Sequence, residues 1–148
     1  ESAVRVARDK VLSIWRQEAP PCPVLGADTA VVLDGHILGK PASRAEAREM
    51  LMRLSGRTHE VFSAIALAVG EERILDALSV SRVTFDDLSD SWVESYLDTG
   101  DSMDKAGAYG VQGRAAEKIS RIEGSFSGVM GLPLFETSQL LHRAEVLF

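Results

Sequence analysis

Apolar residues recur along the chain at two spacings, and each spacing predicts a different kind of element. Near the N-terminus they follow a helical period, which predicts a helix over residues 2–18 that Pro20 and Pro23 end. Further along they alternate or run continuously, as is typical of strands. The strands expected on this basis lie at residues 24–25, 30–33, 37–38, 58–69, 73–85 and 118–122.

Turn and capping residues divide these elements. Asp34-Gly35 is a strong hairpin signal between two short strands. Ser43 with Glu46 forms a capping box, which predicts a helix through about Leu54. Strands mixed with helices in 148 residues therefore predict one mixed α/β or α+β domain, residues 1–148, around a curved sheet.

The stretch "DTGDSMDKAGAYGVQG", residues 98–113, is the least regular part of the chain. It follows a short helix capped by Ser89 or Asp90, and a strand and a helix opened by Pro133 come after it. With four glycines among its residues, we expect it to bury no core face. A loop of this length in a small domain is usually functional or disordered, and its charges favour function.

Composition and charge exclude several classes of protein. The chain is 45% hydrophobic with a net charge of −6 and no basic block, which argues against a nucleic-acid polymer as partner. A few local cations could still hold the phosphates of a nucleotide. Cys22 is the single cysteine, so an intramolecular disulfide and a cysteine zinc site are excluded. No apolar stretch has the length of a membrane span and no signal peptide is visible, so a cytoplasmic protein is expected.

Candidate chemistry begins in "VLGADTAVVLDGHILGKP", residues 24–41. Asp28 either caps a turn through its side chain or is a carboxylate on a rigid element that binds a metal or accepts a proton from water. Thr29 either assists that carboxylate or a ligand, or is an exposed strand residue. Lys40 precedes Pro41, which restricts it to an extended backbone. Its ammonium is therefore either directed at a phosphate or simply solvated.

The irregular stretch concentrates further polar side chains. Asp101 and Asp104 could hold a magnesium ion, and Lys105 could neutralise a phosphate. The amide of Gln112 can both donate to and accept from the edge of a base. Each of these residues, like Tyr109, could alone be a surface group, but their concentration in one glycine-rich loop favours a site.

Other motifs carry no chemistry. The glycines match neither a phosphate-binding P-loop nor a dinucleotide fingerprint, and no serine–histidine–acid arrangement is present. His36, His59 and His142 lack metal-ligand spacing and are expected at a hairpin tip, a strand start and a helix end. Trp92 and Tyr96 have helical spacing and are expected to pack in the core.

Four motifs in order resemble one known family. "VLGADTAVVLDGHILGKP", "LSGRTHEVFSAIAL", "DKAGAYGVQG" and "IEGSFSGVMGLPL" are similar to the Maf family of nucleoside triphosphate pyrophosphatases. The resemblance covers the chain from about Ala7 to the C-terminal helix. It implies a fold related to inosine triphosphatase, with a curved mixed sheet flanked by helices and two lobes around a central cleft.

The same resemblance implies a reaction and its residues. A nucleoside triphosphate would be hydrolysed to the monophosphate and pyrophosphate, with Asp28 as proton acceptor for the attacking water. Thr29 and Gln112 match positions associated with substrate selection. Lys40 and Lys10 match family lysines. The form "KAGAYGVQG" resembles the branch that acts on dTTP and UTP rather than the branch that acts on 7-methyl-GTP.

The resemblance also implies a divalent cation, Mg²⁺ or Mn²⁺. Asp28 and Asp104 would hold it, with Asp101 as a further candidate and Lys105 beside them. The sequence departs from the family at Asp101, where the family usually has a glutamate. The shorter side chain would alter its distance to a metal.

Further expectations follow from the family. The resemblance suggests a homodimer, and an alternative function is a nucleotide-binding regulator of septum formation or cell division that acts without turnover. The family's N-terminal strand and its Ser-x-Ser-Pro-Arg-Arg loop do not occur in this sequence. Because those arginines would contact phosphates, a polypeptide that lacked them is expected to have little or no activity.

Overall fold

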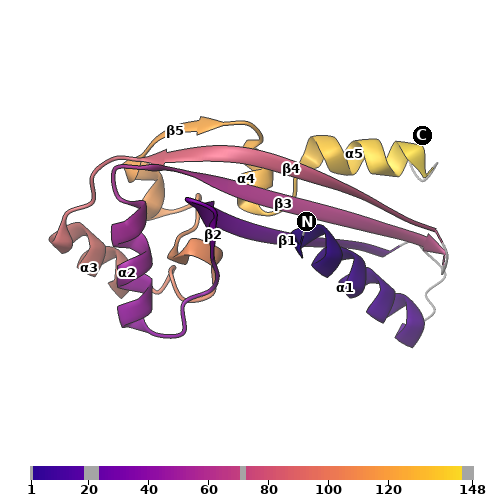
Figure 1. The fold of residues 1–148 in the computed structure, drawn as a ribbon, viewed down its shortest axis with the longest axis horizontal. Helices are drawn as coiled ribbons and strands as arrows, with labels where there is room; N and C mark the ends of the chain where they lie inside the picture. The colour runs from indigo at the N-terminus through magenta and orange to yellow at the C-terminus, as the bar shows by residue number, and fades with distance from the viewer. Residues whose placement is uncertain (1, 19–23, 71–72, 145–148) are drawn as a thin grey trace.

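The computed structural model describes residues 2–18, 24–70 and 73–144 of the chain. Pro20, Pro23 and Cys22 lie outside these ranges, so the expected end of the first helix at the two prolines is not among the described features. Five strands form one sheet in the order β2-β1-β3-β4-β5 (Figure 1). The strands are β1 (Val24–Leu33), β2 (His36–Leu38), β3 (Thr58–Gly70), β4 (Arg73–Phe85) and β5 (Ile119–Glu123). The helices are α1 (Ser2–Glu18), α2 (Arg44–Leu54), α3 (Asp90–Asp98), α4 (Phe126–Met130) and α5 (Leu134–Arg143), with 3₁₀ turns at Ala106–Ala108 and Arg114–Lys118.

This architecture confirms the mixed α/β fold class. Every strand pairing in the described ranges is antiparallel, so the mixed strand directions that the resemblance implied are not seen among these strands. None of the described helices is both long enough and apolar enough to cross a membrane.

Strand β1 is continuous, and here the sequence-based expectation of two strands around a turn is wrong. Each residue from Val24 to Val32 has a partner on β3, and Asp28 lies opposite Ala64. A long antiparallel neighbour supplies partners along the whole segment, so the Gly-Ala-Asp-Thr run stays extended. Asp28 therefore does not cap a turn.

The turn and cap signals elsewhere are confirmed. Asp34 and Gly35 both have positive φ, 53° and 79°, as the tight turn between β1 and β2 requires. The Ser43 hydroxyl accepts the Glu46 N–H at 3.1 Å and so caps α2. Ser89 caps α3 in the same way.

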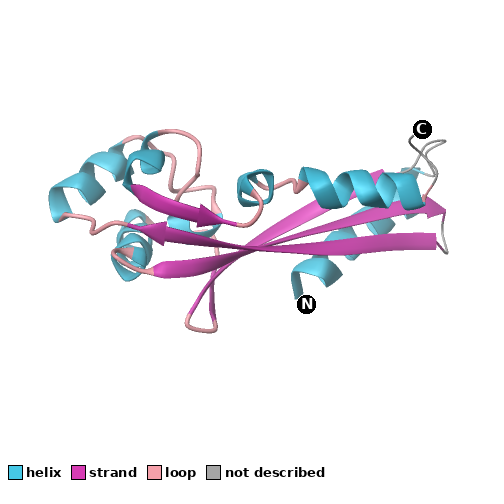
Figure 2. Cartoon of the chain, turned by 90° about the horizontal axis from the view of Figure 1, so that it is seen from above, coloured by secondary structure: helices cyan, strands magenta, loops and turns pink. Residues whose placement is uncertain are grey.

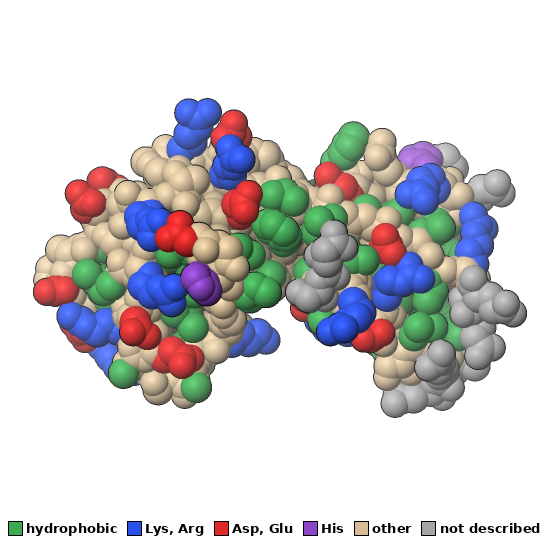
Figure 3. Space-filling model, viewed as in Figure 1, with side chains coloured by type: hydrophobic (Ala, Val, Ile, Leu, Met, Phe, Trp, Pro, Cys, Tyr) green, Lys and Arg blue, Asp and Glu red, His purple; other side chains and the backbone are tan. Residues whose placement is uncertain are grey.

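The long β3–β4 hairpin joins two lobes (Figures 1 and 2). At one end, α2, α3 and the irregular stretch pack against the sheet around the main core. At the other end α1 covers one face of β3 at Ala64, Ala66 and Ala68, and α5 covers the opposite face at Ile65 and Leu67. Burial on both faces explains why β3 reads as a continuous apolar run. The molecule narrows between the lobes (Figure 3).

The irregular stretch does bury a core face, which corrects the sequence-based expectation. Ala108 and Tyr109 belong to the main core, and the Ser102 side chain is fully buried. A sequence with many glycines can do this because one aromatic ring buries a large area, and Val111 is buried beside it. The short helix α4 follows β5, at a place where the sequence predicted no element.

Gly26 lets α1 lie close against β1, and Gly26→Ala is expected to lower the free energy of unfolding by about 1–3 kcal/mol. An added Cβ would lie 2.7 Å from Cγ1 of Val11 and 3.4 Å from the carbonyl oxygen of Ala7. Val11 is β-branched and fully buried, so it cannot turn aside. Urea unfolding measures the loss. Gly39→Ala is the matched control, because no atom lies within 4 Å of its added Cβ; equal stability losses in both variants would contradict this prediction.

Candidate active site

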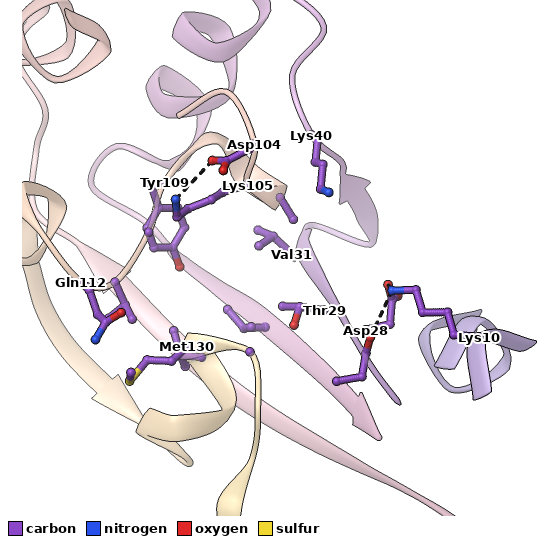
Figure 4. Close-up of a pocket in the computed structure, with 17 residues that line it drawn as sticks. Lys10, Asp28, Thr29, Val31, Lys40, Asp104, Lys105, Tyr109, Gln112 and Met130 are labelled. Atoms are coloured by element: carbon purple, nitrogen blue, oxygen red, sulfur yellow. Dashed lines mark hydrogen bonds and ion pairs between the residues drawn. The ribbon is translucent and has the colours of Figure 1, made fainter. Parts of the chain in front are cut away.

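A pocket of about 330 Å³ receives residues from both lobes (Figure 4). This volume is at the lower end of the range for small-molecule sites. Its lining comes from α1, from β1, from the segment after β2, from the irregular stretch and from the end of α4. These segments are far apart in the sequence, so the pocket exists only in the folded chain.

Asp28 and Lys10 meet at one side of the pocket. The Lys10 ammonium lies 3.3 Å from Oδ1 of Asp28 and 3.1 Å from the carbonyl oxygen of Ala27. The Asp28 side chain is 26% exposed, so water reaches it, while β3 holds its backbone in place. A carboxylate placed on a rigid strand and open to solvent can act as a proton acceptor.

Two more lysines face this pocket from its upper side in Figure 4. Lys40 comes from the segment after β2, and Lys105 pairs with Asp104 at 3.2 Å. The Lys105 hydrogen bond holds the pKa of Asp104 below its usual value. The stem of Lys105 passes over Gly110, where an added Cβ would lie 2.7 Å from Cε. A glycine at this position therefore keeps the lysine close to the pocket wall.

The opposite side of the pocket is more apolar. Gln112 and Met130 lie together there, away from Lys10 and Lys40 (Figure 4). Val111 and Val129 also line this pocket, and Thr29 lies between its two ends. An elongated ligand with an anionic end and a flat, partly apolar end matches this distribution of groups.

The fold thus brings together most of the residues proposed from the sequence. Those that line the pocket are Lys10, Asp28, Thr29, Lys40, Asp104, Lys105, Tyr109 and Gln112. Asp101 is not among the lining residues, and its carboxylate instead lies near Gly113. The roles assigned to all these residues stay predictions.

His59 is the residue whose importance the sequence reasoning missed. It was expected at a strand start, and it does lie near the start of β3, but it is buried and its Nε2 lies 2.7 Å from the Tyr109 hydroxyl. Burial lowers its pKa from 6.5 to about 4 and raises the pKa of Tyr109 above its usual value. The sequence did hold a signal for this burial. Side chains two positions apart on a strand point to the same face, and His59 is two positions from the apolar Val61, which is buried too.

The pocket's carboxylates fit a metal ion only in part. In the part of the chain that the structure describes, no three His, Cys, Asp or Glu side chains group around a common point that could hold a metal. Asp28 and Asp104 line the pocket from different elements. A hard cation such as Mg²⁺ commonly takes one or two carboxylates and completes its shell with phosphate oxygens and water. The donors present suit that arrangement and not a cage built from protein alone.

Fold and pocket together define a small α/β domain with a cleft for an anionic organic ligand. The family model described as "Maf-like protein" matches residues 1–144. The chain therefore belongs to the Maf family, which confirms the resemblance of its four motifs.

Curated relatives are identical to this chain at about half of the aligned positions. The dTTP/UTP pyrophosphatase of Bordetella avium is 51% identical over 147 residues, which are 97% of this chain and 73% of that protein. The dTTP/UTP pyrophosphatase of Cupriavidus pinatubonensis is 52% identical over 133 residues, 90% of this chain and 66% of that protein. The same enzyme of Polaromonas sp. is 54% identical over 129 residues, 87% of this chain and 63% of that protein. The chain thus spans about two thirds of the length of these relatives.

Proposed function

We propose that this protein hydrolyses dTTP or UTP to the nucleoside monophosphate and pyrophosphate. The observation that carries the proposal is the pocket, which combines Asp28 on a rigid strand with three lysines and an apolar end. Relatives that are about 50% identical and are named dTTP/UTP pyrophosphatase support it. The protein would act on the nucleotide pool of the cytoplasm, as a homodimer.

In the proposed reaction, one water molecule attacks the α-phosphorus and the bond to the β-phosphate oxygen breaks. Asp28 accepts a proton from that water, and Lys10 holds the carboxylate in place. Lys40 and Lys105 neutralise the negative charge that moves onto the departing pyrophosphate. A divalent cation held by Asp28 and Asp104, when bound, would add further positive charge at the phosphates.

The apolar end of the pocket would hold the base. The Gln112 amide can donate to and accept from a pyrimidine edge, and Met130 and Val129 offer apolar surface to the ring. The small volume favours one ring over two. Thr29 lies between the two ends and would contact the sugar or the α-phosphate (Figure 4).

The test is release of pyrophosphate from dTTP and UTP with Mg²⁺ or Mn²⁺, with ATP and 7-methyl-GTP as comparison substrates. Turnover of dTTP or UTP at a higher kcat/KM than that of the purine nucleotides is the expected result. Nucleotide binding without any pyrophosphate release would contradict the proposal and would favour the regulatory alternative. Repeating the pyrophosphate-release assay without the cation tests whether the reaction needs the metal. Measuring the molecular mass by sedimentation equilibrium tests whether the protein is a homodimer.

Lys40→Met is expected to raise the KM for dTTP about tenfold, because one charge that faces the triphosphate is lost. The KM of the wild type should rise more steeply with added salt than that of the variant, since screening weakens the same attraction. Steady-state kinetics at two salt concentrations measure both effects. Lys118→Met is the control, as Lys118 does not line this pocket. An unchanged KM in Lys40→Met would contradict a phosphate contact.

A further inference from the structure

A buried pair of ring side chains connects the irregular stretch to the sheet. The Tyr109 hydroxyl and His59 Nε2 are 2.7 Å apart, and 50 positions separate the residues in the sequence. The His59 side chain is 2% exposed and Tyr109 is 5% exposed. Phe85 contacts both rings, at centroid distances of 5.8 Å to His59 and 4.9 Å to Tyr109. The pair is therefore held within the main core.

The hydrogen bond has a preferred direction. His59 Nδ1 is buried and has no hydrogen-bond partner in the described part of the chain. If Tyr109 donates to Nε2, one group, the Nδ1–H, is left unpaired. If Nε2 donates instead, both the tyrosine hydroxyl proton and the Nδ1 lone pair are left unpaired. The first arrangement leaves fewer buried groups unsatisfied, so a neutral His59 accepts from Tyr109.

Among the described residues, three hydrogen bonds to other parts of the fold tether the segment that carries Lys105 and Gln112. The Gly107 N–H donates to the carbonyl oxygen of Gly39 at 3.1 Å. The Gly110 N–H donates to the Tyr96 hydroxyl at 3.2 Å. The third contact is the Tyr109 hydrogen bond to His59. It alone among the three joins two side chains, so either partner can be removed by substitution without changing the backbone.

We propose that His59 is a positioning residue for the nucleotide pocket, and that it acts by holding Tyr109 and thereby the segment from Lys105 to Gln112. The role in catalysis rests on the proposed function. His59 is not itself among the residues that line the pocket. Tyr109 is, and Lys105 and Gln112 lie four and three residues from it on either side.

The position of Asp28 makes the effect selective. The backbone of Asp28 is held by the pairing of β1 with β3, opposite Ala64, whereas the irregular stretch packs on β1 three positions further along, at Val31. Loss of the His59–Tyr109 contact should therefore displace groups that bind the nucleotide while the proton acceptor stays in place. The expected signature is a rise in KM together with a fall in kcat that is much smaller than the loss expected when the proton acceptor itself is replaced.

The experiment compares Tyr109→Phe, His59→Leu, the double variant and His59→Gln, whose carbonyl oxygen can accept from Tyr109. We expect either single substitution to raise the KM for dTTP about tenfold and the double variant to raise it no further, because both remove one contact. His59→Gln should return KM to within about threefold of the wild type. Leu140→Ala is the control for lost stability, since Leu140 is fully buried in a separate apolar cluster.

Hydrogen exchange at the Gly107 and Gly110 amides gives a second readout that needs no nucleotide. Exchange should become faster in Tyr109→Phe and His59→Leu and stay as in the wild type in Leu140→Ala. If the wild type neither binds nor hydrolyses dTTP or UTP, the proposed function fails, and the exchange rates still decide the positioning role. Unchanged exchange in Tyr109→Phe, or a KM in Leu140→Ala raised as much as in Tyr109→Phe, would overturn the inference.

Discussion

Asp28→Asn is expected to lower kcat for pyrophosphate release from dTTP by about 10²–10⁴-fold, because asparagine cannot accept the proton of the attacking water. The substitution keeps the shape of the side chain and its place opposite Ala64 on β3. It also releases Lys10 from its ion pair, which leaves that ammonium free for a phosphate. Nucleotide binding, measured by calorimetry without turnover, should therefore be retained while turnover is lost.

A neighbouring aspartate provides the matched control for this variant. Asp34 lies on the exposed tip of the β1–β2 turn and pairs with Arg57 at 2.6 Å, outside the pocket. Its φ is 53°, a conformation that asparagine tolerates. Asp34→Asn should turn over like the wild type. Wild-type turnover in Asp28→Asn would refute the proton-acceptor role.

Acid should destabilise this protein through one buried imidazole, by up to about 3 kcal/mol. Burial lowers the pKa of His59 from 6.5 to about 4, so the folded state resists protonation while the unfolded chain accepts a proton below pH 6.5. Stability from this group is therefore complete above pH 6.5 and is lost as the pH falls toward 4. The steepest expected loss is about 1.4 kcal/mol per pH unit.

Urea unfolding between pH 7 and pH 4.5 tests this dependence. Carboxylates also titrate in this range, so the wild type is compared with His59→Gln, in which they are unchanged. The variant should lose less stability on acidification than the wild type. His36→Gln, at the exposed start of β2, keeps the His59–Tyr109 contact and should follow the wild type. If the free energy of unfolding fell equally with pH in the wild type and in His59→Gln, the loss of stability in acid would not come from His59.

Much of the fold was predictable because its signals are local. The Asp34-Gly35 turn depends on two residues that adopt positive φ, and the cap of α2 depends on Ser43 and Glu46, three positions apart. The long runs of β3 and β4 follow from their continuous and alternating apolar residues. The order of four motifs was sufficient for the family, which the family model confirmed.

Two errors arose where distant segments decide the structure. Residues 26–29, Gly-Ala-Asp-Thr, have the composition of a turn. They stay extended because they pair with residues of β3 that lie more than thirty positions later in the sequence. The irregular stretch looks unable to bury a core face, yet the Tyr109 ring reaches His59 and Phe85 in the interior. Both outcomes depend on partners that no local window contains.

By itself, the sequence determined the helices and strands with local signals, the family, and the set of residues from which a site could be built. The tertiary structure decided which of those residues share a pocket, since it places Lys10, Asp28, Lys40 and Lys105 together and leaves Asp101 apart. It also identified His59 as the buried partner of Tyr109. The physical reason is that helix and turn formation depends on neighbours along the chain, whereas a pocket and a buried hydrogen bond depend on how the sheet brings distant segments together.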